Sequence, residues 1–172
     1  MKDNKALVVS EYAIDVKPYN TNCKAATWET CTLRKWLNST FINEAFDINE
    51  QMVIQETELK TEATAEGMSD INTKDKIFLL SIDEVNKYFN PNQSRMCNAT
   101  KHAIEEGAYC CNEKAQNSNS ALCCYWLRSA AIKPMNGTTV NCVGVINQDE
   151  FPVNQNWVGI RPTMWISLKN SF

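Results

Sequence analysis

The sequence contains little glycine and almost no histidine. Only 5 of its 172 residues are Gly, and no Gly-rich phosphate-binding loop occurs. His102 is the single histidine, which excludes a mechanism built on paired histidines. No run approaches the roughly 20 apolar residues of a membrane helix, and the first ten residues lack the apolar stretch of a secretion signal. We therefore expect no membrane insertion, no export signal and a cytoplasmic or phage-particle location.

Positive charge is also scarce. The net charge is −3 and the isoelectric point is about 5.3. A chain without a basic field cannot rely on phosphate attraction, so we expect no nucleic-acid partner.

Cysteine, in contrast, is abundant, with 8 residues that include two adjacent pairs, Cys110-Cys111 and Cys123-Cys124. No C-x-x-C occurs, and no Cys/His spacing of a zinc site. Neighbouring side chains of a strand point to opposite faces, so each pair can offer one inward thiol at most. We expect most of the cysteines to be buried or incidental thiols in a reducing compartment. Structural disulfides are the second interpretation, metal ligands the third, and a catalytic nucleophile the last. No metal or cofactor is predicted.

The spacing of apolar residues and the positions of turn and capping residues predict an α+β fold in a single domain, residues 1–172. Thr27 is the predicted N-cap of the first helix and Asn38 its end, Ser81 and Glu84 form a capping box, and Gly107 ends a helix opened by Thr100. The predicted helices cover residues 28–37, 41–46, 81–89 and 100–106. The predicted strands cover residues 6–10, 51–59, 76–80, 122–128, 140–146 and 157–168, the last one interrupted at Pro162. Residues 60–74 and 112–120 are predicted loops.

Three sequence blocks are specific: residues 27–38 (TWETCTLRKWLN), residues 75–81 (DKIFLLS) and the pair of Tyr125-Trp126-Leu127-Arg128-Ser129 with Gly159-Ile160-Arg161-Pro162. Together they resemble an uncharacterised bacterial and phage domain family marked by a Trp-Leu-Arg-Ser-Pro-Gly block and a terminal Gly-Val-Arg-Pro block. The resemblance spans nearly the whole chain. Here Ala130-Ala131 follow Ser129 in place of Pro-Gly.

The resemblance implies a C-type-lectin-like fold of the formylglycine-generating-enzyme type, with short helices in the first half and a small antiparallel sheet built mainly from the second half. It also implies that an N-terminal strand region found in many members is absent or lies outside this chain. Some members are variable, ligand-binding proteins diversified by retroelements.

By the same resemblance, the stretch between the two Arg blocks is the variable binding surface, held by framework residues Val140, Gly144, Ile146 and Val153. A mixture of aromatic and amide side chains on loops held by a rigid scaffold is typical of an adaptable binding surface. The alternative is an ordinary pair of irregular loops, in which the Asn residues merely form turns. The expected partner is an unknown protein or surface ligand. The predicted binding residues are Tyr125, Ile132, Lys133, Met135, Asn136, Thr139, Asn141, Val143, Val145, Asn147, Gln148, Asp149, Phe151, Asn154, Gln155, Asn156 and Trp157.

Five residues are predicted to be structural: Trp28, Trp36, Trp126, Arg128 and Arg161. A buried Arg requires a carboxylate or carbonyl partner, so we expect the two arginines to pin the terminal strand to the Trp126 strand. Binding of a substrate anion is the alternative.

The predicted function is a non-enzymatic ligand-binding or display domain. An oxidase resembling formylglycine-generating enzymes is one alternative, for which Cys123, Cys124 and Cys142 are the candidate thiols. A structural domain of a larger assembly is another. A calcium-dependent lectin ranks below these, because the usual calcium-binding triplets are missing.

Overall fold

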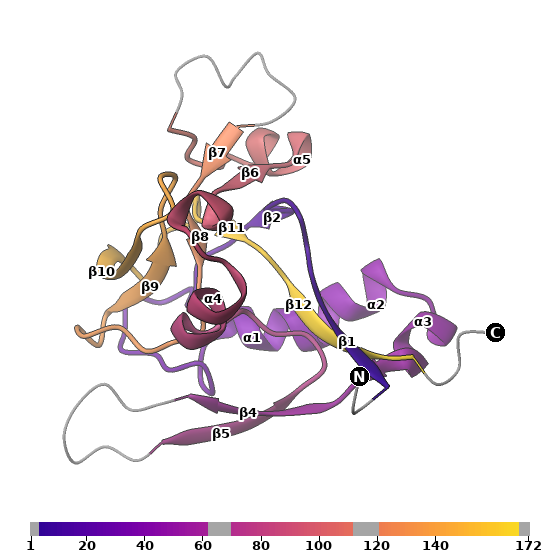
Figure 1. Cartoon of the computed structure of the whole chain (residues 1–172). Coiled ribbons are helices and arrows are strands. Elements are labelled where there is room, and N and C mark those ends of the chain that lie inside the picture. Colours follow the sequence, from indigo (N-terminus) through magenta and orange to yellow (C-terminus); the bar gives the residue numbers. More distant parts are fainter. Residues whose placement is uncertain (1–3, 62–69, 112–120, 169–172) are drawn as a thin grey trace.

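A computed structural model describes residues 4–61, 70–111 and 121–168 of the chain. Its largest sheet has five strands in the order β10-β9-β8-β11-β2 (Figure 1). The strands are antiparallel except for β8 and β11, which pair in parallel through Tyr125 and Gly159. Their bounds are Asp15–Val16 (β2), Tyr125–Trp126 (β8), Asn136–Val140 (β9), Ile146–Pro152 (β10) and Gly159–Ile160 (β11).

The first and last strands of the described chain lie side by side in a second sheet of order β1-β12-β3 (Figure 1). Five antiparallel residue pairs join β1 to β12, from Lys5 with Ser167 to Val9 with Thr163. The predicted strand at residues 6–10 is therefore confirmed, as is the interruption of the last strand at Pro162, which separates β11 from β12. The bounds are Lys5–Val9 (β1), Ile54–Gln55 (β3) and Thr163–Ser167 (β12).

The prediction of one strand over residues 140–146 was wrong, because residues 141–145 form the turn between β9, which ends at Val140, and β10, which begins at Ile146. The Asn141 side chain accepts hydrogen bonds from the backbone amides of Val143 and Val145. Gly144 has a φ of +78°, which favours glycine. Of the valines in this segment, Val140 ends β9, whereas Val143 and Val145 lie in the turn itself.

Two further sheets have two strands each. They are β4 (Thr57–Thr61) with β5 (Ile71–Asp75), and β6 (Cys97–Ala99) with β7 (Ala121–Cys123). The prediction of a loop over residues 60–74 was wrong at both ends, because residues 60–61 belong to β4 and residues 71–74 belong to β5. Both strands are polar, but Leu59 and Thr73 are buried, which gives the hairpin one inward face. Residues 62–69 and the predicted loop at residues 112–120 lie outside the described residues.

A continuous helical run is formed by α1 (Thr32–Trp36), the π-helical turn η1 (Leu37–Phe41) and α2 (Ile42–Ala45). The predicted start at Thr27 was wrong. Thr27 and Thr30 bond to each other in the preceding turn, and Cys31 is the N-cap. Asn38 does not end the helix either, because its amide bonds to Arg34 and to the backbone of Ile77 from inside the run.

The remaining helices follow capping signals. The capping box of Ser81 and Glu84 opens α4 (Ile82–Tyr88), and Thr100 caps α5 (Lys101–Glu105), as predicted. A second capping box, Asp47 with Glu50, opens α3 (Ile48–Val53), so the strand predicted over residues 51–59 was wrong in its first part. A short 3₁₀ helix, η2, covers Asn92–Arg95. None of the helices in the described part of the chain is long and apolar enough to cross a membrane.

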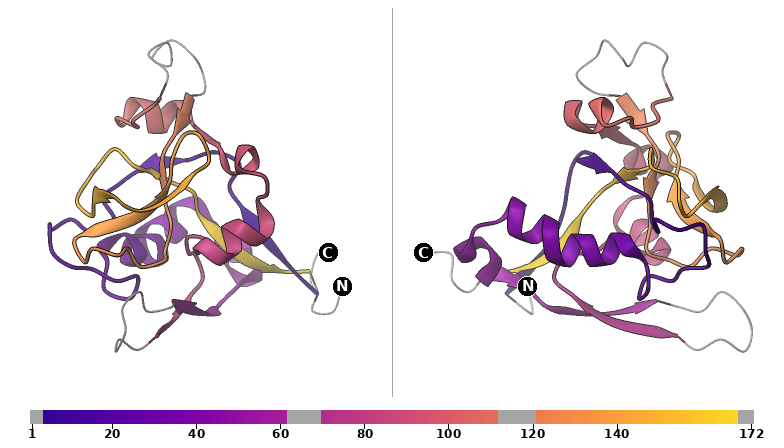
Figure 2. Two further views of the ribbon diagram at one scale, coloured as in Figure 1. Left: turned by 60° about the vertical axis from the view of Figure 1, so that its left-hand side comes forward. Right: turned by 180° about the vertical axis from the view of Figure 1, so that it is seen from behind.

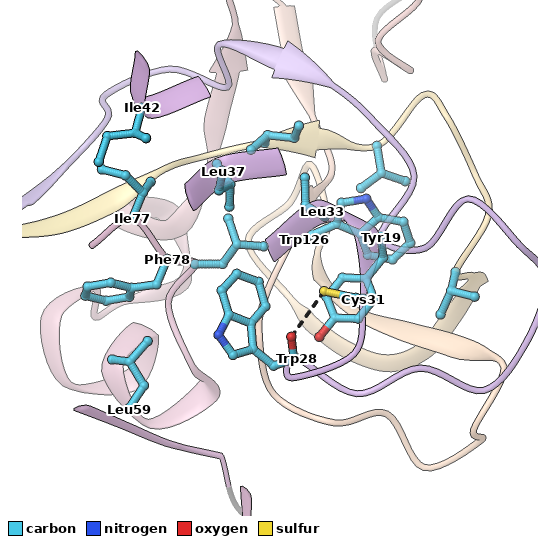
Figure 3. Packing of buried hydrophobic residues seen from close by; sticks show 14 of the residues in the cluster. Tyr19, Trp28, Cys31, Leu33, Leu37, Ile42, Leu59, Ile77, Phe78 and Trp126 are labelled. Atoms are coloured by element: carbon cyan, nitrogen blue, oxygen red, sulfur yellow. Dashed lines mark hydrogen bonds between the residues drawn. The ribbon is translucent and has the colours of Figure 1, made fainter. Parts of the chain in front are cut away.

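The fold is thus mixed α+β, with short helices around small, mainly antiparallel sheets. The run α1–η1–α2 and the helix α4 lie on opposite sides of the molecule (Figures 1 and 2). Between them, Trp28, Phe78 and Trp126 lie in the larger of two buried clusters (Figure 3). The apolar run at residues 76–80 is buried almost throughout, as expected, but the prediction that it forms a strand was wrong. Among the described residues a single bridge, Phe78 with Thr163, connects it to a sheet.

Candidate functional site

An open groove lies between α4 and β10. Figure 2 (left) shows the β9–β10 hairpin beside α4. The groove, here called the α4–β10 groove, has a volume of about 720 Å³. It is lined by Ile82, Asn86, Ile132, Ile146, Asn147, Gln148, Asp149 and Glu150. A second hollow of about 620 Å³ at β4, the β4 cleft, adjoins it, because Ile82, Ile132 and Gln148 line both.

An irregularity in β10 creates this lining. Asn147 pairs with Thr139 and Phe151 with Gly137, so three residues of β10 face a single residue of β9. A bulge of this kind releases residues from the strict alternation of a strand. Gln148, Asp149 and Glu150 can therefore all border the groove, although they follow one another in sequence.

The neighbouring loop is fixed to the bulge by hydrogen bonds. Asp149 accepts a bond of 2.7 Å from the backbone amide of Lys133, and the side-chain amide of Asn136 donates to the Asp149 carbonyl at 2.8 Å. The backbone amide of Ile132 donates to the carbonyl of Gln148. The side chains of Ile132 and Lys133 remain exposed. The structure thus brings the predicted residues Ile132, Lys133, Asn147, Gln148 and Asp149 together on a supported backbone.

Two predicted binding residues are buried and were wrongly assigned to the surface. Tyr125 is 1% exposed, its hydroxyl donates to the carbonyl of Arg95, and burial raises its pKa to about 12. Thr139 is 0% exposed; it pairs with Trp126, and residues 137–140 of β9 are buried on both faces of the strand. Its hydroxyl donates to the Glu150 carboxylate at 2.9 Å, which allows a polar residue at this buried position.

The other predicted binding residues lie away from the α4–β10 groove in the described structure. Asn141, Val143 and Val145 form the hairpin turn, where Gly144 packs against the Asn92 carbonyl. Of the remaining ones, Met135 and Asn136 follow the loop at residues 132–134, and Phe151 lies at the end of β10. The others follow β10, and they are Asn154, Gln155, Asn156 and Trp157.

An aromatic cluster involves one residue that the sequence did not indicate. Phe151 meets Trp157 edge-on at 4.6 Å between ring centroids. The exposed ring of Tyr109 lies 5.3 Å from Trp157, and its backbone amide donates to the Trp157 carbonyl. Tyr109 follows α5 in a stretch without a motif, so nothing in the sequence pointed to it.

The three predicted structural tryptophans support the core. Trp126 donates to the carbonyl of Lys17, and Trp28 donates to the buried carboxylate of Asp75 at 2.9 Å. Trp36 is half-buried and lies 4.6 Å from the Lys17 amine.

The two predicted structural arginines have the expected kinds of partner. Arg128 forms a buried ion pair with Glu84 of α4 and donates to the carbonyl of Leu79. Arg161 donates to the carbonyl of Ser10 at 2.7 Å and lies over the rings of Phe89 and Tyr125. Arg161 therefore contacts the Trp126 strand as expected, whereas Arg128 ties that strand to α4 rather than to the terminal strand.

Six of the eight cysteines are free thiols and four of these are buried, in line with the main expectation. Cys111 and Cys142 form a disulfide, so the preference for free thiols was wrong for this pair. Cys123 and Cys124 point into different buried clusters, as the strand geometry predicted. Burial raises the pKa of Cys124 to about 11. Cys123, Cys124 and Cys142 do not line the α4–β10 groove, and within the described residues no group of three or more His, Cys, Asp or Glu could hold a metal ion.

The disulfide gives a direct prediction. Thiol titration of the unfolded, unreduced protein should find six free thiols of the eight. The double substitution Cys111→Ser/Cys142→Ser should lower the free energy of unfolding by about 2 kcal/mol, because the open chain gains entropy when unfolded. Urea unfolding measures this loss, and Cys23→Ser, at an exposed free thiol, is the control. Eight titratable thiols would contradict the disulfide.

A family model described as a domain of unknown function, DUF6273, matches residues 3–168. The chain belongs to the DUF6273 family. No curated protein and no solved structure matches it. The match extends from the first strand to the end of β12, so the α4–β10 groove and the sheet that supports it both lie within the DUF6273 domain.

Proposed function

We propose that this DUF6273 domain is a non-enzymatic ligand-binding or display domain, and that the α4–β10 groove with its rim at residues 132–133 is the centre of its binding surface. We further propose that its fold is C-type-lectin-like and that the surface corresponds to that of retroelement-diversified variable proteins. The ligand class is a protein or another surface-exposed molecule.

The observation that carries the proposal is the bulge in β10. It places Asn147, Gln148 and Asp149 consecutively along the groove, while hydrogen bonds to Asp149 hold the facing loop. The backbone is fixed by bonds that do not depend on the side chains of Ile132 or Gln148. A surface of this kind can change its side chains without losing its scaffold, which is what an adaptable binding site requires.

The framework residues support the same interpretation. Val140, Gly144 and Val153 are buried and Ile146 is half-buried, whereas Ile132, Lys133 and Met135 are exposed. Among the described residues, four of the five strands in the largest sheet come from the second half of the chain, and four of the five α-helices come from its first 90 residues. This is the order that the lectin-like resemblance implies.

Tolerance to substitution tests the display role. The triple variant Ile132→Ala/Asn147→Ala/Gln148→Ala should change the Tm by about 4 °C or less, because each side chain is accessible and the backbone bonds remain. Leu127→Ala, at a fully buried position of the adjoining segment, should lower the Tm by about 9 °C. Thermal unfolding followed by circular dichroism measures both. If the triple variant loses as much as the Leu127 variant, the groove is part of the core and not a display surface.

The genomic neighbourhood tests the diversification. A nearby reverse transcriptase gene with a near-copy of the region that encodes residues 129–161, differing only at adenines, would support a variable-protein role. A neighbourhood without the gene and the copy would contradict that part of the proposal and leave a ligand-binding domain of fixed sequence.

A further inference from the structure

Three cysteines line up across three neighbouring chain segments. Cys97 of β6 pairs with Cys123 of β7, and Cys123 also forms a bridge to Cys110 on its other side. Side chains of directly opposite residues in an antiparallel pair lie on the same face. Cys97 and Cys123 accordingly share one buried cluster, and Cys110 packs against it. The three thiols therefore form a row with Cys123 in the middle.

The spacing of the row follows from the hydrogen bonds. The outer edge of β6 is bonded to Ala13 through Asn98 and Thr100, so the backbone of Cys97 faces β7 and the pair with Cys123 is of the hydrogen-bonded type. Such pairs have Cα atoms about 5.5 Å apart. The bond from the Cys111 amide to the Leu122 carbonyl makes Cys110 with Cys123 a non-hydrogen-bonded pair, at about 4.5 Å. A disulfide spans about 4.4–6.8 Å between Cα atoms, so both pairings fit without movement of the backbone.

Access and charge distinguish the three thiols. Cys97 and Cys123 are buried, whereas Cys110 is half-buried. A hydrogen bond from Cys123 and the nearby Arg161 guanidinium lower the pKa of Cys97. The same bond and burial raise the pKa of Cys123. Of this buried pair, Cys97 is therefore the thiol that ionises first.

We propose that Cys110, Cys123 and Cys97 form a thiol–disulfide exchange site that accepts small-molecule disulfides and ends in a disulfide between Cys97 and Cys123. This site is separate from the α4–β10 groove and does not rest on the proposed binding function.

The steps balance as follows. The Cys110 thiolate attacks one sulfur of the small disulfide, whose S–S bond breaks and releases one small thiol. Cys123 passes its proton to the neighbouring Cys97 thiolate and, as a thiolate, attacks the Cys110 sulfur of this mixed disulfide; the second small thiolate that leaves takes this proton from Cys97. The Cys97 thiolate then attacks the Cys123 sulfur and expels Cys110 as a thiolate. Two cysteine thiols are oxidised, one small disulfide is reduced to two thiols that carry away the two protons, and Cys110 is regenerated.

The test uses the full chain incubated with oxidised glutathione, quenched by alkylation, unfolded, digested and mapped by mass spectrometry without reduction. We expect a linked peptide pair that contains Cys97 and Cys123, alongside the existing link of Cys111 to Cys142. Alkylated Cys97 and Cys123, or a final link of Cys110 to Cys123, would overturn the proposal.

Two variants test the order of the steps. Cys110→Ser should slow formation of the Cys97 link at least tenfold, whereas Cys23→Ser, which removes an exposed thiol elsewhere, should leave the rate unchanged. An unchanged rate in the Cys110 variant would refute the role of Cys110 as the entry point. Cys97→Ser should accumulate the Cys110–Cys123 link, and its absence would refute the second step even if the Cys110 variant folded poorly.

Discussion

Glu84→Gln should lower the free energy of unfolding by about 4 kcal/mol, because it removes the only carboxylate bound to the buried guanidinium of Arg128 among the described residues. The side chain of Arg128 is 5% exposed and that of Glu84 is 23% exposed, so water can replace only part of the lost interaction. Glutamine retains an oxygen that can accept from the Ser81 amide, so the helix cap is preserved and the loss reports the ion pair. Urea unfolding followed by fluorescence measures it.

Asp83→Asn is the matched control, since it removes the same charge one residue earlier at an exposed position of α4. It should change the free energy of unfolding by about 0.5 kcal/mol or less. Adding Arg128→Met to Glu84→Gln should restore part of the stability, because the unpaired charge is then gone. Equal losses for Glu84→Gln and Asp83→Asn would show that the pair does not stabilise the fold.

Glu84 shows which features of the fold could be predicted from short-range sequence signals and which could not. The capping box of Ser81 and Glu84 and the cap at Thr100 are fixed by residues within three positions of each other, so sequence spacing revealed them. The second role of Glu84, as the partner of Arg128, joins residues 44 positions apart and could not be predicted from spacing. Asp47 and Glu50 carry an equally local signal, which the strand predicted over residues 51–59 left out of account.

The candidate site depended more on tertiary contacts. Thr139 is polar, and only its position opposite Trp126 and its bond to Glu150 reveal that it is buried. The bulge in β10 depends on the pairing register with β9, which the sequence pattern does not encode visibly. The disulfide joins residues 31 positions apart among 8 cysteines, and connectivity of this kind cannot be deduced from cysteine counts.

The scaffold behind the site depends on one close contact, that of Gly137 with Trp126. A Cβ atom at Gly137 would lie 2.3 Å from the six-membered ring of Trp126, far inside van der Waals contact. The ring cannot move away easily, because it is fully buried, donates to the Lys17 carbonyl and packs against Tyr19. Gly137→Ala should therefore lower the free energy of unfolding by about 3 kcal/mol through overpacking. Urea unfolding measures the loss.

A double-mutant cycle separates this overlap from a general effect of alanine. Trp126→Phe has a smaller ring system and should be destabilising alone, but the double variant Gly137→Ala/Trp126→Phe should lose at least 1 kcal/mol less than the sum of the single losses. Gly107→Ala is the control, since no atom lies within 4 Å of its added methyl group. Gly107→Ala should lower the free energy of unfolding by about 1 kcal/mol, because the φ of +101° at this position disfavours alanine. Strict additivity in the cycle would mean that the loss in Gly137→Ala does not come from overlap with the Trp126 ring, and this contact would then not be what supports the strand behind the α4–β10 groove.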